Sequence, residues 1–136
     1  MSTQKEIEET SYLDYRGKYK GLFSWIFSTD HKRIGLLYLF SILSLFVIGA
    51  TLGLLMKFEL IAPGNTIMGA QAYNAFFTLH GIVMIFAVVI PGLPAVFGNF
   101  FLPIMIGAKD VAFPRINLFS WYLYVTGVTL VIISQF

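Results

Sequence analysis

The feature that most constrains the fold of this chain is a stretch without a single charged side chain, which runs from Leu60 to Ala108. The 136 residues are 57% hydrophobic and only 12% charged, about half of the charged fraction of an ordinary soluble domain. Of the 16 charged residues (9 Lys and Arg plus 7 Asp and Glu), 11 lie in the first 33 positions. The pattern predicts a polar extension followed by an all-α membrane protein.

Three apolar spans are predicted, over about 34–56, 74–106 and 116–136. A helix of the first span's length crosses a hydrocarbon core of about 30 Å. The second span is longer than one crossing and contains Pro91 and Pro94, so we expect a kinked helix inside a bundle. The third span is still apolar where the sequence stops. We therefore expect residues 1–33 to be a polar cytoplasmic and interfacial extension, and 34–136 to begin a longer polytopic chain.

The placement of Lys and Arg predicts the orientation of the spans. Six lie before residue 34, two in the 107–115 loop, and only Lys57 in the 57–73 loop. By the positive-inside rule, the N-terminus and the 107–115 loop face the cytoplasm, or the matrix of a mitochondrion. Lys57 and the nearby His80 then lie toward the outer surface, whereas Asn99 lies toward the inner one.

Composition also excludes several kinds of site and partner. The chain has no cysteine, which excludes disulfides, thiolate metal sites and thioether-attached haem within these residues. It has neither a basic stripe nor a nucleic-acid-binding motif, so nucleic acid is not an expected partner.

The residues at 75–92, AFFTLHGIVMIFAVVIPG, raise the question of what a single imidazole does in an apolar run. A packing histidine that hydrogen-bonds to a neighbouring helix is one interpretation of His80. The other is an axial ligand of haem iron, because neutral imidazole binds haem iron and porphyrin needs an apolar slot. Met84 and Ala87 share the helix face of His80, and Gly81 lets a bulky group approach. The residues alone leave both interpretations open.

Several stretches together resemble the beginning of subunit I of the haem-copper oxidases, most closely the A-type cytochrome c oxidases. They are STDHKRIGLLY (28–38), FELIAPG (58–64), TLHGIVMIF (78–86) and FGNFFLPIMIGAKDVAFPRIN (97–117). The resemblance implies a bundle of about twelve helices that reduces O₂ to water and pumps protons, of which this chain supplies three. It implies haem A at the low-spin site, with haem B as the alternative, and a high-spin haem and CuB in the remainder of the subunit. These residues alone are not expected to be active.

By the same resemblance, His80 is the first axial ligand of the low-spin haem. Asp110 matches the carboxylate at the mouth of the D proton pathway, with Asn99, Asn117 and Tyr38 along its entrance. Amide side chains offer donors and acceptors without a charge that would trap a proton. Taken without the resemblance, a solvated loop aspartate with two capping asparagines is the simpler interpretation.

Lys57 stands where haem A oxidases usually carry an arginine that bonds the haem formyl group. An ammonium is a mobile point charge rather than a planar fork, so Lys57 is expected to contact the formyl or a propionate, or only to mark the membrane edge. Glu59 and Gly64 match positions that help to bind Ca²⁺ or Na⁺ near the outer surface. A carboxylate and a carbonyl suit a hard cation but form an incomplete site.

The electron donor is predicted from residues that are absent. Quinol-oxidising relatives carry polar side chains where this chain has Ile48, Leu52, Ala72 and Ala75. That favours cytochrome c as donor, through a subunit II with CuA, with subunit III and the rest of subunit I as further partners. The expected location is the bacterial plasma membrane rather than the mitochondrial inner membrane. A quinol oxidase of the same superfamily and a haem-free helical membrane subunit are the alternatives.

Overall fold

The computed structural model describes residues 21–64 and 66–135, and these residues form helices joined by short loops. Three helical stretches are long and apolar enough to cross a membrane: His31–Glu59, Ala70–Met105 and Pro114–Ile133. The predicted all-α membrane class is therefore confirmed. Residues 1–20, the larger part of the predicted polar extension, lie outside the described residues.

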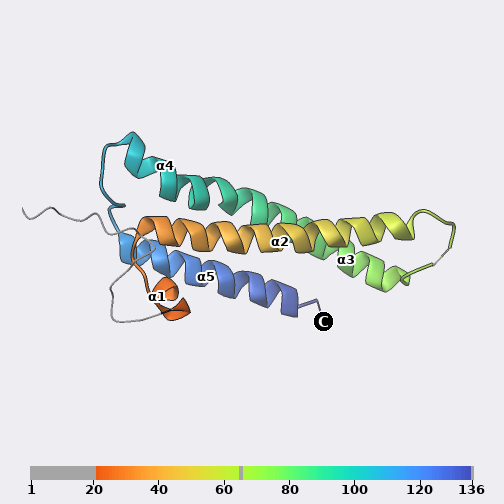
Figure 1. Ribbon diagram of the computed structural model, residues 1–136. Helices are drawn as coiled ribbons and strands as arrows, with labels where there is room; N and C mark the ends of the chain where they lie inside the picture. The colour runs from red at the N-terminus through yellow and green to blue at the C-terminus, as the bar shows by residue number, and fades with distance from the viewer. Residues whose placement is uncertain (1–20, 65, 136) are drawn as a thin grey trace, which may run out of the picture.

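A short helix, α1 (Leu22–Ile26), precedes the first long helix, α2 (His31–Glu59). The side chain of Asp30 accepts a hydrogen bond from the backbone N–H of Lys32 and so caps α2, which satisfies one of the amides that a helix start leaves unpaired. The buried guanidinium of Arg33 donates to the Ser24 carbonyl and lies 4.8 Å from the centre of the Trp25 ring. These contacts fold α1 back against the beginning of α2 (Figure 1).

The second long stretch is a composite of α3 (Ala70–Ile82), η1 (Val83–Val89), η2 (Gly92–Phe97) and α4 (Gly98–Met105). The two middle segments are π-helical, and they flank Pro91. A proline has no N–H to donate to the carbonyl four residues earlier, which for Pro91 is that of Ala87. The hydroxyl of Tyr124 donates to this carbonyl at 2.6 Å instead. The PGLP sequence is thus accommodated by a wider helix and a bond from a neighbouring helix.

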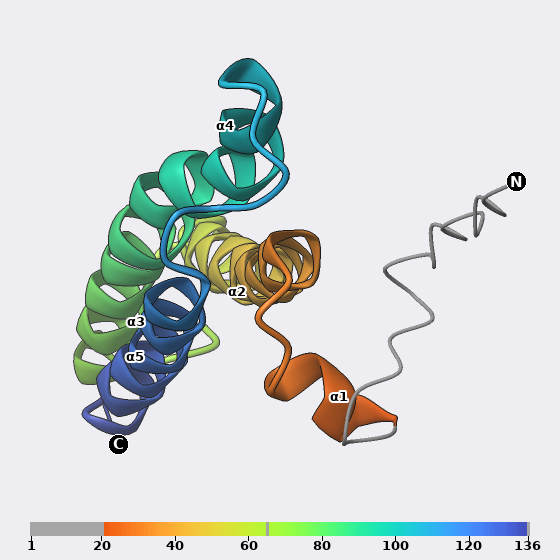
Figure 2. The same ribbon diagram turned by 90° about the vertical axis from the view of Figure 1, so that its left-hand side faces the viewer.

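The long helices run antiparallel in chain order (Figure 1). The stretch from α3 to α4 returns along α2, and α5 (Pro114–Ile133) runs back beside both. Pro114 occupies the first turn of α5, where its missing N–H costs nothing. The end-on view shows α2 between the α3–α4 stretch and α1, with α5 against the lower part of the bundle (Figure 2).

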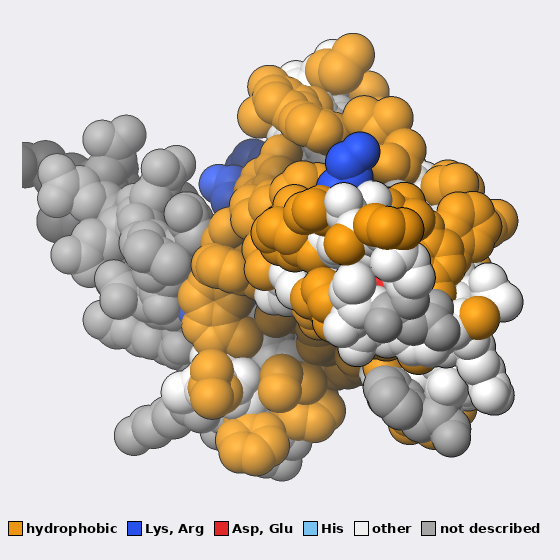
Figure 3. Space-filling view, turned by 90° about the vertical axis from the view of Figure 1, so that its right-hand side faces the viewer, with side chains coloured by type: hydrophobic (Ala, Val, Ile, Leu, Met, Phe, Trp, Pro, Cys, Tyr) orange, Lys and Arg blue, Asp and Glu red, His pale blue; other side chains and the backbone are white. Residues whose placement is uncertain are grey.

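The core lies along α2, in two clusters of buried side chains. The first joins α2 to α5 and η2, and the second joins α2 to α3 and η1; their members are Ile34, Tyr38, Ile42, Val96 and Leu118, and Leu45, Leu79, Val83 and Ala87. Most other apolar side chains are exposed, and hydrophobic atoms dominate the end face in Figure 3. This much exposed apolar surface requires lipid or further helices around the bundle.

Candidate functional site

The imidazole of His80 is held by the backbone of the neighbouring helix. Its Nδ1 atom lies 2.7 Å from the carbonyl oxygen of Gly49 in α2. A carbonyl only accepts hydrogen bonds, so Nδ1 carries the hydrogen and Nε2 keeps its lone pair in the neutral ring. This is the arrangement in which a second group fixes the tautomer and ring orientation of a metal-binding histidine.

Two glycines of α2 make room for this contact. A β-carbon at Gly53 would lie 3.0 Å from Cε1 of His80, and one at Gly49 would lie 2.7 Å from the sulfur of Met84. Glycines four residues apart let two membrane helices approach closely. Gly81, beside His80, has nothing within 4 Å of its β-position. The histidine is therefore packed tightly toward α2, while the helix surface next to it is open.

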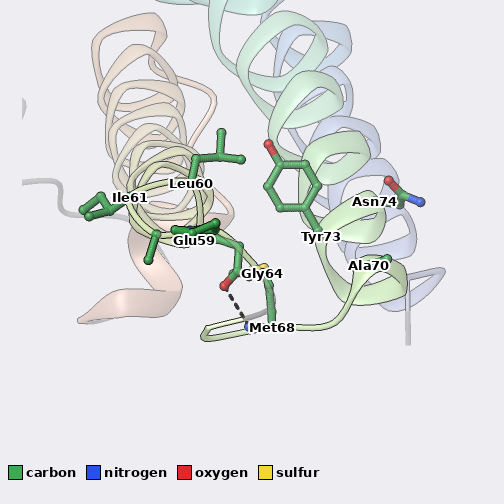
Figure 4. Close-up of a pocket in the computed structure, with 10 residues that line it drawn as sticks. Glu59, Leu60, Ile61, Gly64, Met68, Ala70, Tyr73 and Asn74 are labelled. Carbon is green, nitrogen blue, oxygen red and sulfur yellow. Dashed lines mark hydrogen bonds between the residues drawn. The ribbon is translucent and has the colours of Figure 1, made fainter.

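At the C-terminal end of α2, the carboxylate of Glu59 is buried and accepts hydrogen bonds from the following loop. It accepts the backbone N–H groups of Thr66, Ile67 and Met68 at 2.9, 2.6 and 3.0 Å, and Figure 4 shows its bond to Met68. Gly64 has a φ of 94°, a conformation that glycine adopts readily. Glu59 therefore closes the loop onto the end of α2.

A pocket of about 630 Å³ adjoins this loop, between the end of α2 and the beginning of α3. Glu59 and Gly64 lie on one side of it, and Tyr73 and Asn74 lie on the other (Figure 4). Lys57 is exposed in the last turn of α2, one helical turn beyond Gly53. The structure thus places Lys57 and Glu59 at the end of the helix that contacts His80, and Gly64 in the loop that follows it.

The two predicted asparagines meet directly, although they are on different helices. Nδ2 of Asn117 in α5 donates to Oδ1 of Asn99 in α4, and Nδ2 of Asn99 donates to the Ala95 carbonyl at 2.6 Å. Asn99 is buried. Their side chains thus bond to each other and to the Ala95 carbonyl.

Tyr38 joins the same region through a serine. The Ser120 hydroxyl donates to the Asn117 carbonyl at 2.7 Å and lies 2.8 Å from the Tyr38 hydroxyl. Since a serine hydroxyl has one hydrogen, Tyr38 donates to Ser120. These residues line a cleft of about 320 Å³ together with Pro91, Pro94, Ala95, Asn99 and Tyr124. The cleft offers polar groups from three helices in an otherwise apolar bundle.

Asp110 lies in the loop between α4 and α5, and its side chain is about half exposed. Its Oδ1 atom lies 2.8 Å from Nδ1 of His31, the first residue of α2. Gly49, the partner of His80, follows His31 by 18 residues, which is about 27 Å along a helix. Asp110 and His80 therefore sit at widely separated depths of the bundle.

Sequence reasoning missed several of these contacts. The glycine pair at 49 and 53 has the small-residue spacing of close helix contacts, a signal present in the sequence. The pairings of His31 with Asp110 and of Ser120 with Tyr38 have no such signal, because the partners are 79 and 82 residues apart. Among the described residues, no group of three or more His, Cys, Asp or Glu side chains could hold a metal ion.

Most of this chain is similar to proteins of known family. The family model of cytochrome c and quinol oxidase polypeptide I matches residues 33–136. A probable cytochrome c oxidase subunit 1-alpha of Streptomyces coelicolor is 43% identical over 129 residues, which cover 91% of this chain and 22% of that protein. The protein of the same description from Streptomyces avermitilis is 44% identical over 124 residues, or 88% and 21% of the two chains. The chain thus spans about a fifth of the length of the curated relatives it matches.

Proposed function

Because the chain belongs to the family of cytochrome c and quinol oxidase polypeptide I, we propose that it supplies a haem ligand and a proton entrance to a respiratory terminal oxidase. The oxidase reduces O₂ to water with electrons from cytochrome c and couples this reaction to proton pumping. In this proposal His80 is an axial ligand of the low-spin haem iron. The entrance of the D proton pathway is formed by Asp110, Asn99, Asn117 and Tyr38.

The observation that carries the haem proposal is the hydrogen bond of His80 to Gly49. It occupies Nδ1 and leaves Nε2 as the nitrogen available to iron. The close packing over Gly53 holds the ring plane, and the open surface at Gly81 leaves space for a bulky group. When bound, a haem supplies one-electron transfer at this depth of the membrane, and the protein tunes it through the ligand and its hydrogen bond. The residues present therefore fit the group.

Lys57 bears on which haem is bound. It follows Gly53 by four residues and so lies on the same face of α2 one turn further out. From there a flexible ammonium is suited to a haem formyl group or a propionate. We propose haem A at this site, with haem B as the alternative that Lys57 also accommodates.

Proton uptake is supported by the arrangement at the other end of the bundle. A half-exposed carboxylate, Asp110, exchanges protons with water, and the paired amides of Asn99 and Asn117 orient water without trapping charge. The bond from Tyr38 to Ser120 and on to Asn117 extends the polar lining into the cleft. Because these groups and His80 lie at different depths, electrons and protons enter at different places, and a redox reaction can charge the membrane.

The exposed apolar surface suits lipid and the other helices of a complete subunit I, which would carry the high-spin haem and CuB. We propose subunit II with CuA, subunit III and cytochrome c as partners, in a bacterial plasma membrane with the N-terminus cytoplasmic. Glu59 and Gly64 are proposed as partial ligands of Ca²⁺ or Na⁺. A quinol donor is less favoured, because the positions at which quinol-oxidising relatives carry polar side chains are apolar here: Ile48, Leu52, Ala72 and Ala75.

The test makes two measurements on the oxidase purified through this chain and on its His80→Ala variant. The pyridine haemochrome spectrum identifies the haem type, and the visible absorption spectrum of the intact enzyme reports the low-spin site. Haem A in the parent and loss of the low-spin signal in the variant are expected. Met84→Leu, which changes the side chain beside Gly49 without removing a hydrogen bond, is the matched control and keeps the signal. An unchanged low-spin spectrum in His80→Ala would place the ligand elsewhere, and haem B alone in an enzyme that oxidises quinol would favour the quinol branch.

A further inference from the structure

We propose that His31 positions the carboxylate of Asp110 at the proton entrance by tying the 107–113 loop to the first turn of α2. The inference rests on the proposed function of Asp110 as the group that takes up protons. It assigns to His31 a positioning role, since the imidazole acts through Asp110 and not on the transferred proton itself.

The geometry joins a buried group to an exposed one. The side chain of His31 is 9% exposed, whereas that of Asp110 is 48% exposed. Nδ1 of His31 lies 2.8 Å from Oδ1 of Asp110, a normal distance for a strong hydrogen bond. His31 belongs to α2, the helix along which the core is built, so its position is fixed by packing. The hydrogen bond therefore holds the carboxylate of Asp110, which lies on a loop, in a fixed place beside α2.

The two oxygens of Asp110 have different surroundings. Oδ1 also accepts the backbone N–H of Val111 at 2.7 Å, so it has two donors from different elements. Within residues 21–64 and 66–135, no group donates to Oδ2. Two donors on one oxygen fix the rotation of the carboxylate, and the half-exposed side chain then presents its other oxygen to water. A proton is exchanged at Oδ2 without breaking the contact with His31.

A second carboxylate faces the same imidazole nitrogen. Oδ1 of Asp30 lies 3.9 Å from Nδ1 of His31, and the same oxygen accepts the N–H of Lys32 at 2.8 Å. Asp30 is thus held by the helix start and is farther from the imidazole than Asp110 is. The shorter distance assigns the hydrogen bond of Nδ1 to Asp110.

The experiment uses the complete oxidase containing this chain, in membrane vesicles, with turnover and proton uptake from the inner side as readouts. His31→Ala is expected to slow both by about two- to fivefold, the scale of a partly exposed hydrogen-bonded pair. His31→Asn keeps a nitrogen donor at the δ position and restores most of the rate. His31→Gln moves the donor one bond further out and restores less, which gives a second comparison if His31→Ala does not assemble. Haem content of each variant, measured from its visible spectrum, confirms assembly.

A double-mutant cycle separates positioning from a general structural effect. If His31 acts through Asp110, His31→Ala adds nothing to Asp110→Asn. Lys109→Ala is the matched control, because it removes an exposed cation next to Asp110 without removing the hydrogen bond; it leaves the rates near those of the parent at high salt.

Three results would overturn the inference: parent rates in His31→Ala, no gain in His31→Asn over His31→Ala, or additive effects in the cycle. If Asp110→Asn slows the enzyme while His31→Ala does not, only the positioning role fails. If Asp110→Asn itself has normal turnover and pumping, the proposed proton entrance fails together with it.

Discussion

The carbonyl oxygen of Gly49 accepts a hydrogen bond from Nδ1 of His80 at 2.7 Å, and Gly53 lies under the same imidazole ring. The histidine is therefore held by backbone rather than by another side chain. A backbone carbonyl cannot be removed by substitution, so the sensitive positions are those that decide how closely the two helices approach.

We expect Gly53→Ala to displace the His80 ring. The new β-carbon would lie 3.0 Å from Cε1 and 3.4 Å from Nδ1, so the ring must shift by a few tenths of an ångström and weaken its bond to Gly49. The expected result is a shift of the low-spin haem absorption and of its reduction potential, with haem still bound, measured by redox titration of the purified oxidase. Gly127→Ala, where a β-carbon meets nothing within 4 Å, is the control. Identical titrations for Gly53→Ala and the control would contradict the packing argument.

Asp110→Asn is expected to slow turnover by about a hundredfold, the lower end of what a positioned proton-transfer group contributes, while haem content stays normal. An asparagine keeps the shape and can still accept a hydrogen bond, but it cannot take up a proton. Oxygen consumption and proton release in vesicles measure the effect. Asp30→Asn removes a carboxylate at the same end and keeps the helix cap; its turnover should stay close to that of the parent. Equally slowed turnover in the two variants would show that the loss of a negative charge at this end, and not of Asp110 in particular, matters.

Tyr124→Phe is expected to destabilise the protein, because it leaves the Ala87 carbonyl without the donor that compensates for Pro91. Hydrogen bonds between membrane helices contribute about 0.6 kcal/mol on average and up to about 1.7 kcal/mol, and we expect a loss toward the upper value. Thermal unfolding in detergent measures it. Thr129→Val on the same helix is the control, since its hydroxyl donates only to the Val125 carbonyl four residues earlier. A loss no larger than that of the control would mean that Ala87 finds another donor.

Glu59→Gln is expected to loosen the 60–69 loop. The amide side chain has one oxygen in place of two, and its NH₂ group would face the N–H groups that the carboxylate now accepts. Faster hydrogen exchange at Ile67 and Met68, measured by mass spectrometry, is the expected result, with Gln71→Ala as an exposed control nearby. Repeating the measurement with chelator and with added Ca²⁺ tests the cation proposal. Slower exchange with Ca²⁺ in the parent, but not in Glu59→Gln, would support it.

The sequence by itself determined the class of the fold. Charge is absent over spans long enough to cross a membrane, and such spans must form helices because lipid offers no partner for backbone N–H and C=O groups. The sequence also identified His80 as the unusual side chain, since an ionisable group within an apolar span needs a reason to be there. The resemblance to an oxidase subunit rested on local motifs, which remain readable however the helices pack.

Only the tertiary structure decided the contacts between helices. Asn99 meets Asn117, His31 meets Asp110, and Tyr124 meets Ala87 through bonds that span 18, 79 and 37 residues. The physical reason is that helix periodicity states which residues share a face, but not which face of another helix lies opposite. That choice depends on the close approach allowed by Gly49 and Gly53, on the π-helical segments around Pro91, and on the loops that set the register of α4 and α5. Until these are fixed, the distance between His31 and Asp110, which are 79 residues apart in the sequence, is undefined.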